Sequence, residues 1–144
     1  MIVVNDCQPE GRGKLELASS DPSHYPSITP KLLETDRTLK RLTDGVKLVR
    51  KIFGAGAIRS YIEQEMTPGN DVNSAMEIEA WLRSAVVNTS HPSGTCKMGQ
   101  DDDAVVNERL QVRGVENLRV IDASIMPSIT TGNTNAPTIM IAEK

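Results

Sequence analysis

The chain has 144 residues, a length that suits one domain, and 24% of them are charged. Its formal net charge of -3 argues against a nucleic-acid-binding protein that relies on a basic surface. The apolar runs are only a few residues long, whereas a transmembrane helix needs about 20 apolar residues, so we expect no membrane span.

Residues 13–30 predict a strand followed by an extended surface loop. Polar and apolar residues alternate over residues 14–18, which is typical of a half-buried strand. Pro22, Pro26 and Pro30 then follow at intervals of four residues. Because proline has no backbone N–H to donate, this spacing favours an extended path over a helix.

Residues 36–53 predict an amphipathic helix. Its apolar residues recur at steps of three and four, which places them on one helical face: Leu39, Leu42, Val46, Val49 and Phe53. Gly54 follows the last of them, where a helix commonly ends.

A second helix is predicted to begin at Ser74 and to end near Val87. Ser74 and Glu77 have the spacing of a capping box, in which each side chain bonds a backbone N–H of the other residue. The apolar stripe of this helix consists of Ile78, Trp81, Leu82 and Ala85. Residues 67–70, Thr-Pro-Gly-Asn, predict a turn between the two helices.

Beyond residue 88, polar loops surround a short predicted strand at 118–121 and lead to a final helix that begins near Pro137. Proline suits the first helical turn, where a missing N–H costs nothing. Because this helix would stop after about two turns, and isolated helices that short are unstable, we expect the chain to be cut within it. The first residues lack the features of a secretory signal, so Met1 is expected to be an internal methionine or a truncation point.

The two cysteines, Cys7 and Cys96, are too few and too far apart for a disulfide framework. We therefore expect reduced thiols in a cytoplasmic protein. No spacing of Cys and His is typical of zinc, and no metal site is expected.

Two loops contain candidate functional residues. The first, residues 88–99, carries His91 between proline and glycine residues. A loop can hold an imidazole at a fixed angle, and imidazoles titrate near neutral pH. A single loop histidine nevertheless has an ordinary structural or surface role more often than a functional one, and His24 is interpreted in that way.

The second loop, residues 122–138, leads from the predicted strand to the start of the last helix and is rich in side-chain amides. A helix N-terminus has free N–H groups and the positive end of the dipole, so it suits an anion or a polarised oxygen. The alternative is that Asn135 caps the helix and Asn133 makes a turn.

Taken together, three segments resemble the C-terminal signature of the glucose-methanol-choline (GMC) oxidoreductases. They are HPSGTCKMG at 91–99, NLRVIDASIMP at 117–127 and NTNAPT at 133–138, and they occur in the family's order. A looser resemblance extends to residues 13–22 and 36–53. The ending GNTNAPTIMIAEK is most similar to choline dehydrogenases and related alcohol dehydrogenases.

The resemblance implies an α+β fold. Residues 1–90 would form part of the substrate-binding domain, and residues 91–144 would be the C-terminal segment that returns to the FAD-binding domain and is truncated in its last helix. Family members begin with a G-x-G-x-x-G turn that binds the FAD pyrophosphate. No such motif occurs in this sequence, so we expect FAD to be bound mainly by residues outside it.

The implied activity is oxidation of a primary or secondary alcohol, such as choline, by hydride transfer to FAD. His91 would be the base that takes the hydroxyl proton, and Asn133 would hold the substrate oxygen. The implied flavin contacts are Asp122, Ala123, Asn133, Thr134, Asn135, Ala136, Pro137 and Thr138. Ser90 departs from the family pattern, because many members have an aromatic residue before the histidine, and this leaves the shape of the substrate pocket open.

The implied partners are a small-molecule alcohol and an external electron acceptor, with a quinone or similar acceptor preferred over oxygen. The protein would be cytoplasmic, with membrane association only through the acceptor. The isolated chain would be inactive and would tend to oligomerise, because apolar surface would lie exposed.

Two other functions are alternatives to alcohol oxidation. One is a non-catalytic binding or structural domain. The other is a serine hydrolase with Ser93 or Ser90 as nucleophile, His91 as base and Asp101, Asp102 or Asp103 as the orienting residue. The hydrolase is disfavoured because adjacent loop residues rarely point at one another and no G-x-S-x-G turn occurs.

Overall fold

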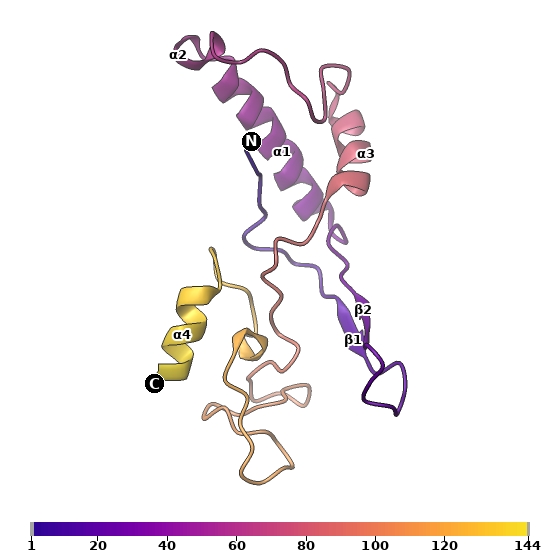
Figure 1. Ribbon diagram of the computed structural model, residues 1–144, viewed down its shortest axis with the longest axis vertical. Helices are drawn as coiled ribbons and strands as arrows, with labels where there is room; N and C mark the ends of the chain where they lie inside the picture. The colour runs from indigo at the N-terminus through magenta and orange to yellow at the C-terminus, as the bar shows by residue number, and fades with distance from the viewer. Residues whose placement is uncertain (1, 144) are drawn as a thin grey trace. The chain divides into compact units, whose positions relative to one another are not determined.

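The computed structural model describes residues 2–143. The chain divides into two compact units, and each is described by itself. The first unit contains the residues up to 6, residues 10–12 and residues 31–87, whereas the second contains residues 7–9, 13–30 and those from 88 on. Helices and a two-stranded sheet both occur (Figure 1), which agrees with the α+β class at the level of secondary structure.

In the first unit, helix α1 spans Asp36–Phe53, with the bounds that the sequence predicts. The side chain of Thr35 accepts a hydrogen bond from the backbone N–H of Thr38 and so caps the helix. Asp36 lies in the first turn and basic residues lie in the last, which complements the helix dipole. Gly54 is the C-terminal cap, as predicted.

Helix α3 spans Ala75–Ala85, and its capping box is formed as predicted. The backbone N–H of Glu77 donates to Ser74 Oγ at 3.2 Å, and the backbone N–H of Ser74 donates to Glu77 Oε2 at 2.8 Å. The backbone N–H of Asn73 donates to the same carboxylate oxygen at 3.0 Å. These bonds satisfy N–H groups that a helix start otherwise leaves unpaired.

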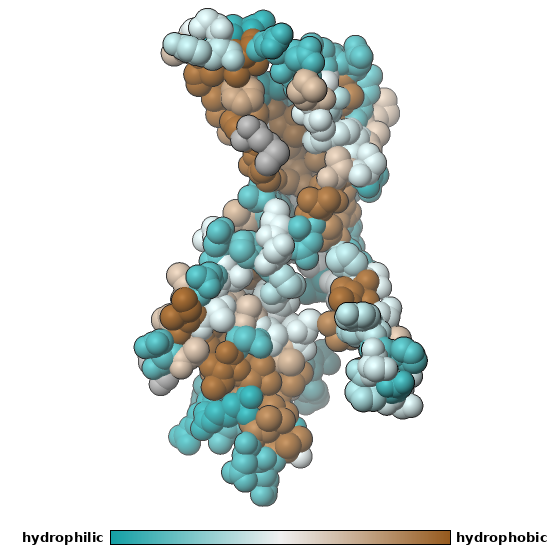
Figure 2. All heavy atoms as spheres, viewed as in Figure 1, coloured by the Kyte–Doolittle hydropathy of each residue, from teal (hydrophilic) through white to brown (hydrophobic). Residues whose placement is uncertain are grey.

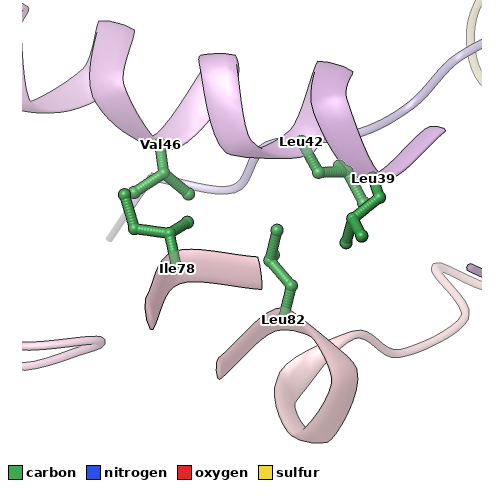
Figure 3. Close-up of a cluster of buried hydrophobic side chains, with 5 residues drawn as sticks. All are labelled: Leu39, Leu42, Val46, Ile78 and Leu82. Atoms are coloured by element: carbon green, nitrogen blue, oxygen red, sulfur yellow. The ribbon is translucent and has the colours of Figure 1, made fainter. Parts of the chain in front are cut away.

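The core of the first unit lies between α1 and α3. Figure 3 shows side chains from the two helices meeting there: Leu39, Leu42 and Val46 from α1, with Ile78 and Leu82 from α3. The other residues of the predicted stripes, Val49, Phe53, Trp81 and Ala85, are only half-buried. Gly45 lets Val4 approach α1, because a Cβ at residue 45 would come within 2.4 Å of the Val4 side chain.

The connector between α1 and α3 contains a short helix, α2 (Gly56–Arg59), that the sequence analysis did not predict. Arg50, near the end of α1, makes hydrogen bonds to two residues of the connector. Its guanidinium makes paired hydrogen bonds to the carboxylate of Glu65, at 2.9 and 2.8 Å, and a third to the carbonyl of Gly69 at 3.2 Å. Such paired geometry is among the stronger forms of ion pair.

In the second unit, β1 (Lys14–Glu16) pairs antiparallel with β2 (Ser27–Thr29). The strand predicted at 14–18 is therefore confirmed but shorter, and the predicted extended path contains a second strand. Gly13 permits the pairing, since a Cβ there would lie 2.6 Å from the carbonyl oxygen of Thr29. The expected half-burial is wrong, because Leu15 and its partner Ile28 are both exposed.

The strand predicted at 118–121 is wrong. Only an isolated bridge joins Gln111 to Arg119, flanked by hydrogen bonds from Val112 N–H to the Leu118 carbonyl and from Val120 N–H to the Leu110 carbonyl. Leu110, Gly114 and Asn117 have φ values of 61°, 78° and 59°. These left-handed residues bend the chain, so a regular ladder cannot extend.

The chain then passes through a 3-10 turn, η1 (Ala123–Ile125), and ends in helix α4 (Asn135–Glu143). Pro137 is the third residue of α4, in the first turn as predicted. Among the residues that the structure describes, no helix is both long and apolar enough to cross a membrane.

Candidate functional site

The loop that carries His91 is shaped by local backbone geometry. The backbone N–H of Ser90 donates to Asn88 Oδ1 at 2.7 Å. Ser90 has a φ of 64° and Gly94 a φ of 86°. A left-handed residue directly before His91 therefore sets the direction in which the imidazole leaves the loop, and the imidazole itself is half-buried.

Backbone hydrogen bonds attach the end of this loop to the segment that contains η1. Cys96 N–H donates to the Ser124 carbonyl at 3.0 Å, and Met98 N–H donates to the Ile125 carbonyl at 2.8 Å. Met98 also forms an isolated β-bridge with Val106. Val106 and Ile125 are fully buried. The first and second motifs of the sequence analysis thus form one packed assembly within the second unit.

A side-chain hydrogen bond joins the first motif to the third. His91 Nδ1 lies 3.1 Å from Thr134 Oγ1, a contact between residues 43 positions apart. Thr134 is only 8% exposed, although the residues on either side of it, Asn133 and Asn135, are exposed. The structure therefore brings His91 to the residue that directly precedes α4.

Thr134 also anchors the first turn of α4. Its carbonyl accepts hydrogen bonds from the backbone N–H of Thr138 at 3.0 Å and from the Thr138 hydroxyl at 2.7 Å. Asn135 is the first residue of the helix, so it does not occupy the cap position that one interpretation of the sequence gave it. The N–H groups of Asn135 and Ala136 lie in the exposed first turn, where a helix leaves its donors unpaired.

Asp122 is an exposed cap of η1. Its carboxylate accepts a hydrogen bond from the backbone N–H of Ser124 at 2.8 Å. Hydrogen bonds from the side chain and the backbone of Ser124 hold the pKa of Asp122 below its ordinary value. Asp122 thus shapes the turn in which the Ser124 carbonyl binds the loop of His91, and Ala123 lies half-buried in the same turn.

The arrangement does not favour a hydrolase. Asp101 bonds Lys97 Nζ at 2.8 Å and the backbone N–H of Asp103 at 3.0 Å. The bond from Lys97 is the main reason why the pKa of Asp101 is lowered. Within residues 2–143, no hydrogen bond links His91 to a serine or to a carboxylate, so the serine–histidine–carboxylate arrangement of such a site is not formed.

The thiols of Cys7 and Cys96 are both free. Cys7 is exposed and Cys96 is half-buried in the His91 loop. In the part of the chain that the structure describes, no group of three or more His, Cys, Asp or Glu residues could hold a metal ion.

The hydrogen bond between Thr134 and His91 was not predicted. Thr134 was expected only as a flavin contact, and the resemblance to the GMC family implied no hydrogen-bond partner for the His91 ring. The available signal was its position in NTNAPT, between two amides and at a helix start, where a threonine side chain often bonds to a neighbouring group.

Comparison with known proteins decides the family. The sequence profile of the GMC oxidoreductases matches residues 9–142. The chain belongs to the GMC oxidoreductase family. The resemblance seen in the three motifs is thereby confirmed, and the family implies FAD as the cofactor.

Among curated relatives, an alcohol dehydrogenase [acceptor] of Pseudomonas putida is 46% identical over 140 residues, which is 97% of this chain and 25% of that protein. The mitochondrial choline dehydrogenase of Homo sapiens is 48% identical over 134 residues, covering 92% of this chain and 23% of the relative. This GMC chain thus spans about a quarter of the length of these relatives.

Solved structures give the same result for the fold. Pyridoxine 4-oxidase from Mesorbium loti superimposes with a TM-score of 0.88 at 35% identity, over 95% of this chain and 27% of the other. An FAD-dependent oxidoreductase from Chaetomium thermophilum superimposes with a TM-score of 0.84 at 30% identity, over 94% of this chain and 24% of the other.

Proposed function

We propose that this GMC chain supplies the catalytic base of an FAD-dependent enzyme that oxidises a primary or secondary alcohol, with choline as the first candidate. The observation that carries the proposal is the 3.1 Å contact between His91 Nδ1 and Thr134 Oγ1, which holds an imidazole beside the start of α4. The names of the relatives, choline dehydrogenase and alcohol dehydrogenase, support this substrate class.

The residues around His91 have the donor chemistry that suits the flavin. The side-chain amides of Asn133 and Asn135 and the backbone N–H groups of Asn135 and Ala136 belong to exposed residues at the positive end of a helix dipole. The isoalloxazine ring becomes anionic on reduction, and such donors favour an anion. We therefore assign flavin contact to residues 133–138, with Asp122 and Ala123 as further contacts.

When bound, FAD supplies the acceptor for the hydride that leaves the α-carbon of the alcohol. The role of His91 is to take the proton of the alcohol hydroxyl as that carbon is oxidised. An imidazole suits this task because it changes protonation near neutral pH, and a positioned base contributes a factor of about 10² to 10⁴ in rate.

Asn133 is assigned to the substrate oxygen. Its side chain is exposed and directly precedes Thr134, so it lies next to the residue that holds His91. An amide N–H there would stabilise the negative charge that builds up on the oxygen while the proton leaves.

Residues 1–90 are assigned to the substrate-binding domain of the whole enzyme and residues 91–144 to its FAD-binding side. The electrons would pass to an external acceptor of the quinone type, and a cytoplasmic enzyme would meet such an acceptor at the membrane. Since the other flavin-binding residues are assigned outside this chain, the isolated polypeptide would be inactive.

The proposal is tested with the FAD-loaded enzyme that contains this chain, mixed without oxygen with choline or with simple primary and secondary alcohols. The expected result is loss of the visible flavin absorbance, slowed when deuterium replaces hydrogen on the α-carbon. Dithionite serves as the control for a reducible flavin. If dithionite bleaches the flavin but none of these alcohols does, the proposed activity is refuted.

A further inference from the structure

The contact between Thr134 and His91 also bears on which ring nitrogen can act. We propose that Thr134 is a positioning residue: its Oγ1 accepts a hydrogen bond from Nδ1–H of His91 and thereby leaves Nε2 unprotonated and available as the base. This inference rests on the proposed function, since it concerns the histidine assigned to proton transfer.

Only one nitrogen of the His91 ring remains for proton transfer. An imidazole has two nitrogens, and Nδ1 lies 3.1 Å from the hydroxyl of a residue that is only 8% exposed. A nitrogen engaged by a buried side chain cannot also meet a substrate hydroxyl. Proton transfer at His91 must therefore take place at Nε2.

The direction of the hydrogen bond between His91 and Thr134 follows from the role of Nε2. For Nε2 to accept a proton, the neutral ring must carry its hydrogen on Nδ1, and Thr134 Oγ1 must then be the acceptor. After transfer, the O–H bond of the alcohol is broken, an Nε2–H bond has formed and Nδ1–H still donates to Oγ1. An accepting hydroxyl thus serves both protonation states without rearrangement.

Thr134 is itself held in place. Its carbonyl takes two hydrogen bonds from Thr138, at 3.0 and 2.7 Å, so the backbone that carries the hydroxyl belongs to the first turn of α4. The loop of His91 is held independently by the bonds of Cys96 and Met98 to the η1 segment. The ring orientation is therefore set by two anchored segments, which is how a catalytic group keeps its geometry.

The tautomer can be measured directly, because the chain contains only His24 and His91. We suggest labelling histidine with ¹⁵N and recording long-range ¹H–¹⁵N spectra of the full chain at alkaline pH, where imidazoles are neutral. A His24→Asn variant assigns the signals. The expected result for His91 is a protonated Nδ1 and an unprotonated Nε2. If His91 in the wild-type chain is mainly protonated on Nε2, that spectrum alone overturns the proposal.

Two substitutions extend the test. Thr134→Val removes the acceptor while keeping the shape, and we expect the proton on His91 to redistribute toward Nε2; Thr134→Ser keeps the hydroxyl and should keep the wild-type pattern. An unchanged tautomer in Thr134→Val would contradict the proposal. The His24 signals should be the same in all three proteins and report on any general disturbance.

In the FAD-loaded enzyme, Thr134→Val should lower the rate of flavin reduction by alcohol roughly 10- to 100-fold with little change in substrate affinity, and Thr134→Ser should restore most of it. A wild-type rate in Thr134→Val would contradict the positioning role. The tautomer of His91 and its role as the base can fail separately. If Nδ1 is protonated but the enzyme works without His91, the tautomer assignment stands and the role of His91 as the base is refuted.

Discussion

Asn133 and Thr134 are adjacent in the sequence but have different surroundings. Thr134 is buried and bonds His91, whereas Asn133 is exposed at the start of α4. The exposed Asn133 and the imidazole of His91 thus both lie at the N-terminal end of α4, and Thr134 joins that end to the His91 loop.

Replacing Asn133 by alanine removes the donor assigned to the substrate oxygen. We expect Asn133→Ala to lower the rate of flavin reduction by alcohol about 100- to 1000-fold, the usual loss for one donor of this kind. Stopped-flow absorbance under anaerobic conditions measures it. Asn73→Ala, in the other unit, is the control, and equal rates for the two variants would show that Asn133 has no part in the reaction.

The candidate site could be predicted from the sequence only as separate pieces. The motifs identified His91 and Asn133 because each lies in a recognisable string of residues. The bond between His91 and Thr134 could not be predicted, because it joins residues 43 positions apart and forms only in the folded chain. Local spacing carries no information about such a contact.

At the scale of the elements, α1 and α3 are stabilised mainly by the side chains buried between them. Ile78 is fully buried in that layer, whereas Met76, two residues earlier on α3, is 77% exposed. Ile78→Ala should therefore lower the free energy of unfolding by about 2 to 5 kcal/mol, and Met76→Ala should change it little. Urea unfolding followed by the fluorescence of Trp81, the chain's single tryptophan, provides the measurement. Similar losses for the two variants would contradict the packing in Figure 3.

The capping box of α3 makes stability depend on pH. Hydrogen bonds from the backbone of Ser74 and of Asn73, and from the Ser74 hydroxyl, hold the pKa of Glu77 below its ordinary value. Because the folded state favours the charged carboxylate, the stabilisation is present above about pH 4.3, the usual pKa of glutamate, and is lost as the pH falls through the lower folded value.

The test of this pH effect is Glu77→Gln, compared with Glu79→Gln on the same helix. Glu77→Gln should flatten the loss of stability in acid, whereas Glu79→Gln should leave the pH profile of urea unfolding close to that of the wild type. If Glu77→Gln has the wild-type acid profile, the carboxylate does not stabilise the helix start.

The success of sequence-based prediction differs between these elements for a physical reason. The bounds of α1 and the start of α3 follow from caps and apolar spacing that lie within the helix itself. The strand predicted at 118–121 failed because residues outside it, Leu110, Gly114 and Asn117, take left-handed conformations that prevent pairing. Gly114 and Asn117 are residue types that favour this conformation, but nothing in the sequence marks it at Leu110.

At the scale of the whole molecule, both units expose hydrophobic side chains (Figure 2). In the hairpin Ile28 is 66% exposed, and in the loop that joins its strands Leu17 and Tyr25 are 87% and 92% exposed. In α4, Ile139 and Met140 are exposed as well. Exposed apolar side chains favour association with other apolar surface.

We therefore expect the isolated 144-residue chain to self-associate as its concentration rises, and the double variant Leu17→Lys, Ile28→Lys to do so less. Sedimentation velocity across a range of concentrations measures both proteins. A wild-type chain that stays monomeric throughout would mean that the exposed side chains do not drive association.

The central claim is that His91 is the base for alcohol oxidation, and one measurement tests it most directly. In the FAD-loaded enzyme, the rate of flavin reduction by alcohol should fall about 100- to 10,000-fold in His91→Ala, while His24→Ala, in an exposed loop, keeps the wild-type rate. A His91→Ala enzyme that reduces its flavin as fast as the wild type would contradict the claim.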